Sequence, residues 1–167
     1  MEQEDKRIPF PQANDFNKIV LLLNIADVRS LRDKEYLMTY LNLGTERQIA
    51  YYLSAMEFLG LINKDKTFTL TGMEIRDSSH DLKILKLCRL IVSLPVFGEV
   101  FFMKYLYNEE LSNNDITQLI SSIYEIENYE VCKRRTSTVV KWLDWVEKNR
   151  QNWIKNYVEW SALEIIL

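Results

Sequence analysis

The amino-acid sequence predicts a mainly α-helical protein, because long stretches of it repeat apolar residues at the spacing of a helix. Only four glycines and three prolines punctuate its 167 residues, which favours helices joined by short turns. Hydrophobic residues make up 47% and charged residues 27% of the chain, a balance typical of folded domains. This length suits one domain or two small units that share an interface.

The chain starts with a polar stretch over residues 1–13, where we expect an extended tail. A helix then begins near Asn14 or Asp15, since either side chain can accept hydrogen bonds from the free amides of a first turn. Apolar residues cover most of this helix, so we expect it to be buried. Ser30 is expected to cap a second helix, which ends at the break before Gly44.

Thr45 is expected to cap a third helix over roughly residues 46–59, whose apolar side chains recur every three or four positions. Gly60 follows at the position where a left-handed residue ends a helix. A β-hairpin with a polar turn is predicted over residues 61–70, and a short helix comes after it. Three helices, a strand pair and a following helix give the order of a winged helix-turn-helix, which we predict for residues 14–79.

A connecting helix is predicted over residues 80–94, and Pro95 ends it and opens the next one. Asn113 or Asn114 is expected to cap a further helix, and a last long helix to run from about Tyr129 to Lys148. The apolar pattern of the third helix returns 87 residues later, where Ile49, Tyr52, Ala55, Met56 and Leu59 fall on Thr136, Val139, Trp142, Leu143 and Val146.

This repeat predicts a second helix-turn-helix unit over residues 95–150, followed by a degenerate wing, a strand or a docking tail over 151–167. The predicted fold class is therefore mainly α, with tandem winged helix-turn-helix units and a short β-hairpin wing in the first.

The residue types predict no cofactor and no metal site. Cys88, Cys132 and the single His80 are isolated in the sequence and cannot form a zinc site by themselves. Residues 1–7 lack the apolar run of a signal peptide, and no apolar run approaches the length of a membrane span. We therefore expect a reduced, cytoplasmic protein.

The formal net charge of −3 and a pI near 5.3 argue against a simple nucleic-acid binder, because neutralising phosphates needs a basic surface. The charge is unevenly distributed, however. Between residues 128 and 150, six Lys and Arg stand against three Asp and Glu, a local balance of +3. This segment holds the start of the second predicted recognition helix, so double-stranded DNA is the partner that the sequence favours.

Arginine can make paired hydrogen bonds to guanine, and serine and threonine can bond phosphates or base edges. The candidate base-reading residues of the second unit are Arg134, Arg135, Ser137 and Thr138, and its candidate phosphate contacts are Lys133 and Lys141. The alternative for this segment is a solvated basic helix end.

The first unit offers a matching set at the start of its own recognition helix. Its candidate base-reading residues are Arg47, Gln48 and Tyr51, and its candidate phosphate contacts are Thr45, Lys64 and Lys66, the lysines at the tip of the predicted wing. The alternative is an amphipathic helix that only packs its unit together.

No catalytic constellation is visible, so we predict no enzymatic activity. The sequence contains no glycine-rich phosphate loop, and any acid–base triad that relies on histidine could use only His80. Asp81-Leu82-Lys83 echoes a nuclease motif but lies in a helical pattern. The tryptophans of the C-terminal half could stack on bases, but their helical spacing is more typical of a core.

Three stretches of the sequence resemble winged-helix units of type IIS restriction endonucleases. The first stretch is Arg47-Gln48-x-x-Tyr51-Tyr52-x-x-Ala55, which continues to Leu59-Gly60-Leu61-Ile62 and to Phe68-x-Leu70-Thr71. The second stretch, residues 90–95, is similar to the link between winged-helix subdomains of these enzymes. The third stretch, residues 139–145, resembles the recognition-helix core of their second unit. The resemblance covers roughly residues 15–147. The chain departs from the pattern at Glu74, and it lacks a glycine-punctuated second wing after Trp145.

This resemblance implies a sequence-specific DNA-recognition module of a restriction-type system. Cleavage would reside in a separate nuclease domain or subunit, because nothing in this chain matches one. The alternative function is a protein-interaction or dimerisation adaptor that binds no DNA. The acidic pI and the aromatic C-terminal segment favour that alternative, in which a homodimer would bury Trp153 and Trp160.

Overall fold

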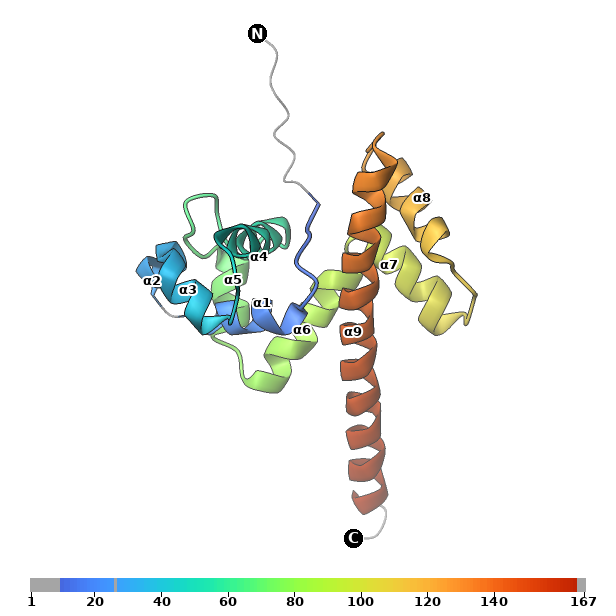
Figure 1. Cartoon of the computed structure of the whole chain (residues 1–167). Coiled ribbons are helices and arrows are strands. Elements are labelled where there is room, and N and C mark those ends of the chain that lie inside the picture. The colour runs from blue at the N-terminus through green and yellow to red at the C-terminus, as the bar shows by residue number, and fades with distance from the viewer. Residues whose placement is uncertain (1–9, 26, 165–167) are drawn as a thin grey trace.

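The computed structural model describes the backbone of residues 10–25 and 27–164, with side chains throughout apart from Val28 and residues 157–164. Helices α1 to α5 form one side of the molecule, α7 to α8 the other, and α6 crosses between them (Figure 1). In chain order the elements are α1 (Phe16–Leu23), α2 (Val28–Arg32), α3 (Lys34–Tyr40), α4 (Glu46–Phe58), α5 (Leu70–Arg76), α6 (His80–Val92), α7 (Pro95–Phe101), the π-helical turn η1 (Phe102–Leu106), α8 (Asn113–Ile123) and α9 (Tyr129–Glu164).

Local capping explains where the helices of the first half begin. The Thr45 side chain accepts a hydrogen bond from the Gln48 amide at 3.3 Å, so the predicted cap of α4 is confirmed. The prediction of one helix capped by Ser30 is wrong, because Ser30 lies inside α2, which Asp27 caps, and Asp33 separates α2 from α3. The Asp33 backbone is extended, and its carboxylate accepts the Tyr36 amide at 3.0 Å, which starts a new helix.

The β-hairpin expected after α4 is represented by a single antiparallel bridge between Ile62 and Phe68, and the described residues form no strand. The second predicted strand stops early because Thr69 caps α5, where its hydroxyl accepts the Gly72 amide at 3.0 Å. Gly72 lies so close to Leu61 that a Cβ would overlap the Leu61 carbonyl oxygen. Only glycine therefore lets α5 approach the turn this closely.

The second half begins as the sequence predicts, with Pro95 at the first position of α7. Helix α8, however, is capped by Ser112 and not by Asn113 or Asn114. Ser112 and Asp115 form a reciprocal capping box, in which each side chain bonds the other residue's backbone amide. This pairing satisfies two of the free amides at the start of the helix.

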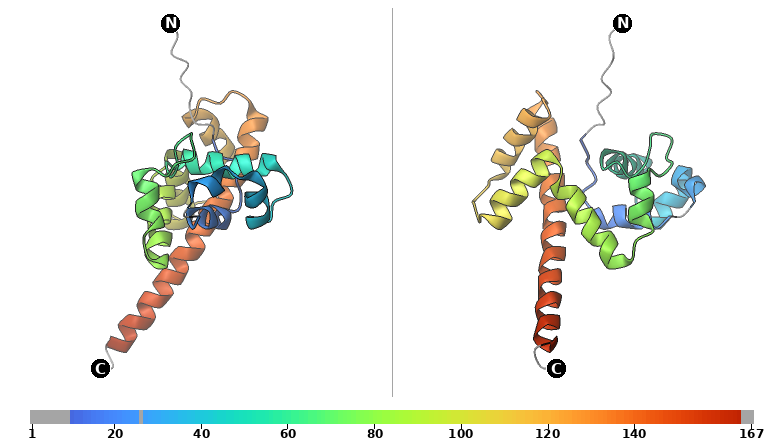
Figure 2. Two further views of the ribbon diagram at one scale, coloured as in Figure 1. Left: turned by 90° about the vertical axis from the view of Figure 1, so that its left-hand side faces the viewer. Right: turned by 180° about the vertical axis from the view of Figure 1, so that it is seen from behind.

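Helix α9 is longer than the sequence predicts. The wing, strand or tail expected over residues 151–167 is helix up to Glu164, and 165–167 lie outside the described residues. No glycine or proline interrupts the 36 residues of α9, so nothing in the backbone ends it earlier. Its last turns project away from the rest of the molecule (Figures 1 and 2). Neither α9 nor any other described helix is both long and apolar enough to cross a membrane.

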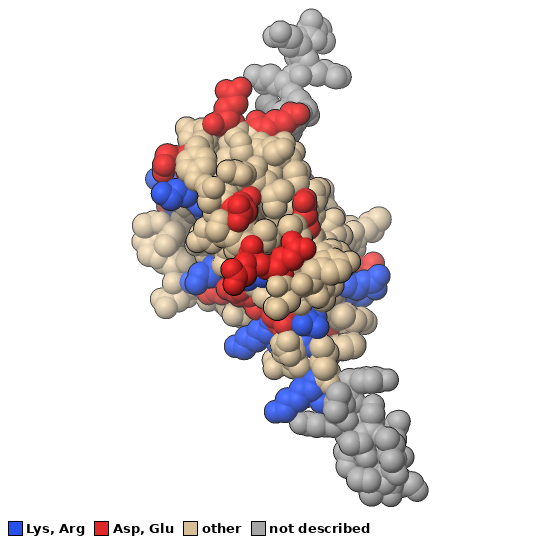
Figure 3. Space-filling model, turned by 90° about the vertical axis from the view of Figure 1, so that its right-hand side faces the viewer, with Lys and Arg blue, Asp and Glu red and all other residues tan. Residues whose placement is uncertain are grey.

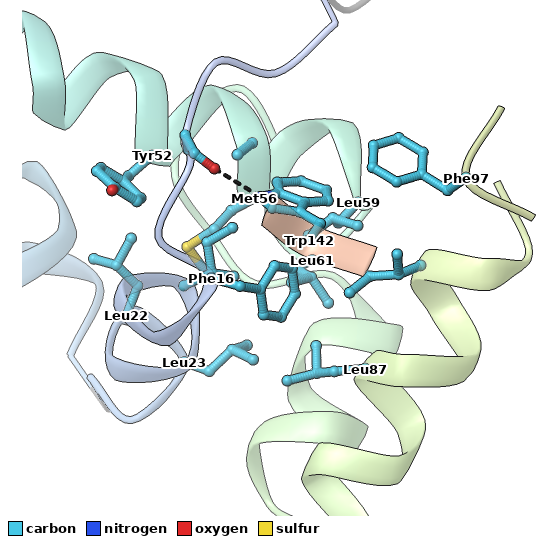
Figure 4. Close-up of a cluster of buried hydrophobic side chains, with 14 of the residues drawn as sticks. Phe16, Leu22, Leu23, Tyr52, Met56, Leu59, Leu61, Leu87, Phe97 and Trp142 are labelled. Atoms are coloured by element: carbon cyan, nitrogen blue, oxygen red, sulfur yellow. Dashed lines mark hydrogen bonds between the residues drawn. The ribbon is translucent and has the colours of Figure 1, made fainter. Parts of the chain in front are cut away.

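One continuous apolar core joins the two sides of the molecule. Trp142 of α9 is fully buried in it, among Phe16 of α1, Leu87 of α6 and Phe97 of α7 (Figure 4). The rings of Phe16 and Trp142 meet edge-on, with their centroids 5.0 Å apart. The two units that the sequence predicts therefore share their core.

Residues 10–13 are not part of the polar tail that the sequence predicts, because they pack into this core. Phe10 and Ala13 are almost fully buried. The Phe10 ring stacks on Phe97 with centroids 5.6 Å apart. The Ala13 carbonyl accepts the Trp142 indole N–H at 2.6 Å, a bond drawn as the dashed line in Figure 4. The segment passes between α4 and α9 and ties them together (Figure 1). The rest of the predicted tail, residues 1–9, lies outside the described residues.

The burial of α4 and α9 follows the repeat in their sequences. Both helices turn the same apolar pattern inward, and the buried pairs are Ile49 and Thr136, Tyr52 and Val139, Ala55 and Trp142, Met56 and Leu143, and Leu59 and Val146. Arg47 and Arg134, which the same shift aligns, are both exposed.

Candidate nucleic-acid interface

A row of lysines runs along the solvent-facing side of α9. Lys133, Lys141, Lys148 and Lys155 are separated by eight, seven and seven residues, close to two helical turns each, so they share one face of the helix. All four are exposed, and within the described part of the chain none of them forms an ion pair. These four residues are called the lysine face below.

The exposed surface around the lysine face is basic overall. From Glu130 to Lys155 it carries five basic side chains, the lysine face and Arg134, against two acidic ones, Glu130 and Asp144, a balance of +3. The Asp144 carboxylate accepts a hydrogen bond from the Tyr105 hydroxyl at 2.6 Å. Burial, helped by this hydrogen bond, raises the pKa of Tyr105 well above its usual range, so the hydroxyl stays protonated and keeps one acid engaged.

Hydroxyl groups on the inner sides of α9 fix its rotation about its own axis. The buried hydroxyls of Thr136 and Thr117 of α8 lie 2.7 Å apart in a hydrogen bond. Thr138 donates to the side-chain Oδ1 of Asn14 at 2.9 Å, and the side-chain Nδ2 of Asn14 donates to the Ser137 hydroxyl at 3.3 Å. These hydrogen bonds to α8 and to the N-terminal segment hold α9 in a rotation that turns the lysine face toward solvent.

The two arginines predicted to read bases in this segment point in different directions. Arg134 is exposed, whereas Arg135 is half-buried and donates to the Phe10 carbonyl at 2.8 Å. The Arg135 guanidinium also lies 5.9 Å from the centroid of the Phe10 ring. Burial lowers the pKa of Arg135 from its ordinary value, and its Nε is buried without a hydrogen-bond partner among the described residues. The bond to the Phe10 carbonyl holds the Arg135 guanidinium against the N-terminal segment, which disfavours the predicted contact of Arg135 with a base.

The prediction that Thr138 reads a base is contradicted by its burial. Its side chain is fully buried against Asn14, so it cannot reach a ligand on the outside of α9. Ser137 is exposed beside the lysine face. Of the four predicted base-reading residues of this unit, the structure leaves Arg134 and Ser137 facing solvent.

At the start of α4, Thr45, Arg47 and Gln48 are exposed and Tyr51 is half-buried, and all four are engaged in local hydrogen bonds. The Gln48 side-chain oxygen accepts the Gly44 backbone amide at 3.0 Å, and the Gln48 backbone amide donates to the Thr45 hydroxyl at 3.3 Å. Arg47 donates to the Tyr51 hydroxyl at 2.6 Å and lies 5.6 Å from the centroid of that ring. These side chains stabilise the first turns of the helix, and Arg47 is the cation that they present to solvent.

The two lysines of the predicted wing differ in their surroundings. Lys64 is exposed, whereas Lys66 has a φ of 69° and forms an ion pair with Glu57 of α4. Hydrogen bonds from Thr67 lower the pKa of Asp65, which keeps a negative charge in the turn. Lys64 is therefore the more available of the two candidate phosphate contacts.

The candidate residues of α4 and α9 meet only indirectly. Phe58 shares the helix face of Arg47 and Tyr51, and its ring contacts Phe10 with centroids 5.4 Å apart. Arg135 of α9 contacts the same Phe10 ring. Among the described residues, no hydrogen bond or ion pair joins the α4 set to the lysine face.

Acidic side chains gather on a different part of the surface. Figure 3 shows the side of the molecule formed by α7 and α8, where Asp and Glu cluster and Lys and Arg lie toward the projecting end of α9. Glu109, Glu110 and Asp115 line a shallow hollow here. The net charge of −3 thus includes an acidic patch on this side of the molecule.

Sequence reasoning missed three residues of this region. Lys148 and Lys155 were not predicted as phosphate contacts, although their spacing from Lys141 is the signal that places them on one helix face. The role of Asn14 in holding Ser137 and Thr138 depends on a contact across more than 120 positions, which no local pattern reveals.

Other sites considered from the sequence do not assemble in the described residues. Lys83 is buried and donates to the Asn24 side chain at 2.8 Å, so the Asp81-Leu82-Lys83 stretch does not present a catalytic lysine. No group of His, Cys, Asp and Glu in the described part could hold a metal ion. Trp142 is core, while Trp153 is 48% exposed. The side chain of Trp160 lies outside the described residues.

Comparison with known proteins gives a family and no function. A search of the curated proteins and a search of the solved structures each found no match. One family does match, over residues 18–151, a stretch that runs from α1 into α9 and includes three lysines of the lysine face. The chain therefore belongs to the family described as Domain of unknown function (DUF7226).

Proposed function

We propose that this protein is a non-catalytic module that binds duplex DNA through the lysine face of α9. The proposal rests on one observation, the row of four exposed lysines without ion pairs in the described residues. Unpaired lysines held along one line attract a polyanion, because each phosphate they neutralise releases condensed counterions from the DNA.

The dimensions of the row suit a duplex. Lys133 and Lys155 are 22 positions apart, so at 1.5 Å per residue the row is about 33 Å long. One turn of duplex DNA occupies about 34 Å. The local excess of exposed basic side chains on α9 answers the objection from the acidic pI, since binding depends on the local field and not on the total charge.

Most contacts of the proposed interface go to phosphates, and fewer go to base edges. Arg134 and Ser137 are the exposed candidates for base edges on α9, and Arg47 of α4 and Lys64 of the turn would add contacts from the first half. We therefore expect strong salt dependence and a modest sequence preference.

The tandem winged helix-turn-helix interpretation belongs to the same proposal. Helices α1 to α5, with the Ile62–Phe68 bridge as a minimal wing, would form the first unit, and α7 to α9 the second. The sequence resemblance to type IIS restriction endonucleases then suggests a restriction-type system, in which a separate domain or subunit cuts the DNA.

The test is fluorescence anisotropy with a labelled 20-base-pair duplex, measured between 50 and 200 mM salt. Replacing Lys133 and Lys141 together by Gln should weaken binding. It should also reduce the slope of log affinity against log salt by about 2, because each lost phosphate contact accounts for about 0.9.

The matched control is Arg29→Gln with Lys86→Gln, which removes the same two charges from α2 and α6. Surface ion pairs such as that of Lys86 with Glu74 contribute little to stability, so the control should fold and bind like the parent protein. Equal losses in both double variants, or no binding of the parent protein at 50 mM salt, would refute the proposal.

A further inference from the structure

A hollow of about 380 Å³ lies between α8 and the first part of α9, at the Lys133 end of the lysine face. The two helices pack side by side here (Figure 1). Lys133, Ser137 and Lys141 of α9 line the hollow, and Asn113 of α8 lines it from the other helix. No acidic side chain is among its lining residues. This space is called the α8–α9 hollow below.

The buried residues of the α8–α9 hollow have no hydrogen-bond donor left for a ligand. Thr117 and Thr136 line it and are both buried, and their hydroxyls lie 2.7 Å apart in a hydrogen bond. The hydroxyls also donate to backbone carbonyls of their own helices, those of Asn113 and Cys132. Two hydroxyl protons serve these contacts, so neither is free. A polar ligand must therefore be bound by the exposed groups of the hollow.

Four exposed side chains of the hollow have donors that are not used among the described residues. Lys133 and Lys141 form no ion pair and no side-chain hydrogen bond there, and the side chain of Asn113 forms none either. The Ser137 hydroxyl accepts a hydrogen bond from Asn14 at 3.3 Å, which leaves its own proton available to donate. The hollow thus offers hydrogen-bond donors and two positive charges.

These groups suit an anion that carries several acceptor oxygens and no donor. A backbone phosphate of a nucleic acid is such a group, and lysine, serine and asparagine side chains all bind it. Lys133 and Lys141 are eight residues apart, about 12 Å along α9, and Ser137 lies midway between them. The two ammonium groups therefore flank the Ser137 hydroxyl, so a phosphate bound there receives charge from both sides.

We propose that the α8–α9 hollow binds one backbone phosphate of the duplex. Asn113 and Ser137 donate neutral hydrogen bonds to it, and Lys133 and Lys141 supply the charge. This inference rests on the proposed DNA binding and deepens it, because it adds α8 to the interface and assigns Ser137 to a phosphate and not to a base edge. Phosphate contacts fix the register and orientation of a protein on its duplex, so the hollow anchors one end of the lysine face to the DNA backbone.

The test compares two double variants by anisotropy with the same labelled duplex. Asn113→Ala with Ser137→Ala should weaken binding about tenfold, because hydrogen bonds to a charged group are lost. The slope of log affinity against log salt should keep its parent value, because neutral side chains release no counterions. The control, Gln118→Ala with Ser122→Ala, removes an amide and a hydroxyl from exposed positions of α8 outside the hollow, and it should bind like the parent protein.

The side-chain amide of Asn113 gives a local measurement by ¹⁵N–¹H NMR. Its signals, identified by their absence in Asn113→Ala, should shift when the duplex is added. Those of Asn24, which accepts a hydrogen bond from Lys83 of α6, should stay in place. Inorganic phosphate, titrated at matched ionic strength, should shift the Asn113 signals only at concentrations far above those of the duplex.

The outcomes separate this proposal from the proposed function. Equal binding by the two double variants, with fixed Asn113 signals and a duplex that still depends on Lys133 and Lys141, would remove the α8–α9 hollow from the interface and leave the lysine face in it. A response to inorganic phosphate at lower concentrations than to the duplex would assign the hollow to a small phosphate compound and overturn the proposal. No duplex binding by the parent protein at low salt would refute both.

Discussion

Neighbouring residues on α9 have opposite surroundings although their sequence suggests one role. Arg134 and Arg135 follow each other in a basic run, yet Arg134 faces solvent and Arg135 bonds the Phe10 carbonyl. Successive residues of a helix are about 100° apart, so only one of two adjacent arginines can point directly away from the core. The sequence predicts the helix here correctly, but which arginine turns inward depends on Phe10, 125 positions away.

This difference predicts that replacing Arg135 affects mainly the stability of the fold, whereas replacing Arg134 affects mainly DNA binding. Arg135→Ala should lower the free energy of unfolding by about 1–2 kcal/mol, because a hydrogen bond and the packing against Phe10 are lost. Arg134→Ala should leave stability within about 0.5 kcal/mol, as is usual for exposed positions, and should weaken duplex binding. Urea unfolding and anisotropy on both variants check this, and the reverse order of effects would contradict it.

At the scale of elements, signals within a few residues explain most of the helix starts. Thr45 before α4 and Pro95 in α7 were predicted from their own chemistry. Asp33 was missed because an acidic residue inside a helical pattern is also an ordinary surface residue. The length of α9 was missed because its polar stretch after Lys148 resembles a helix end, although it contains no residue that breaks a helix.

The capping box of α8 predicts a dependence on pH. Hydrogen bonds from the Ser112 hydroxyl and amide lower the pKa of Asp115 below its usual 3.8. A carboxylate with a lowered pKa in the folded state contributes stability above its unfolded pKa, and this contribution disappears as the pH falls through the folded pKa. Asp115→Asn should therefore lower the Tm at pH 6, and the gap from the wild type should narrow toward pH 3. A gap that stays constant over this range would contradict the assignment.

At the scale of the whole molecule, the described residues pack as one body around Trp142. The repeat in the sequence correctly predicts which positions of α4 and α9 are buried, but it suggests two units joined by a connecting helix. What joins them more closely is the segment of Phe10 and Ala13, whose few apolar residues lie in a polar stretch without periodicity. Only the folded chain shows that this segment fills the space between α4 and α9.

Phe10→Ala should consequently destabilise the whole molecule. The ring contacts Phe58, Phe97 and Tyr124, which come from both sides, and large-to-small core substitutions of this kind cost about 3–5 kcal/mol. Helix content by circular dichroism and tryptophan fluorescence should report one coincident, earlier transition. Two separated transitions in the wild-type protein would show that the halves unfold independently.

The most direct test of the proposed DNA interface is lysine footprinting by acylation and mass spectrometry, with and without a saturating duplex at low salt. The account predicts that Lys133, Lys141 and Lys148 become protected when DNA is bound, while Lys34 of α3 and Lys104 of η1 react as before. Protection of Lys34 or Lys104 with the lysine face still fully reactive, or no protection of any lysine, would contradict the assignment of α9 as the DNA-binding helix.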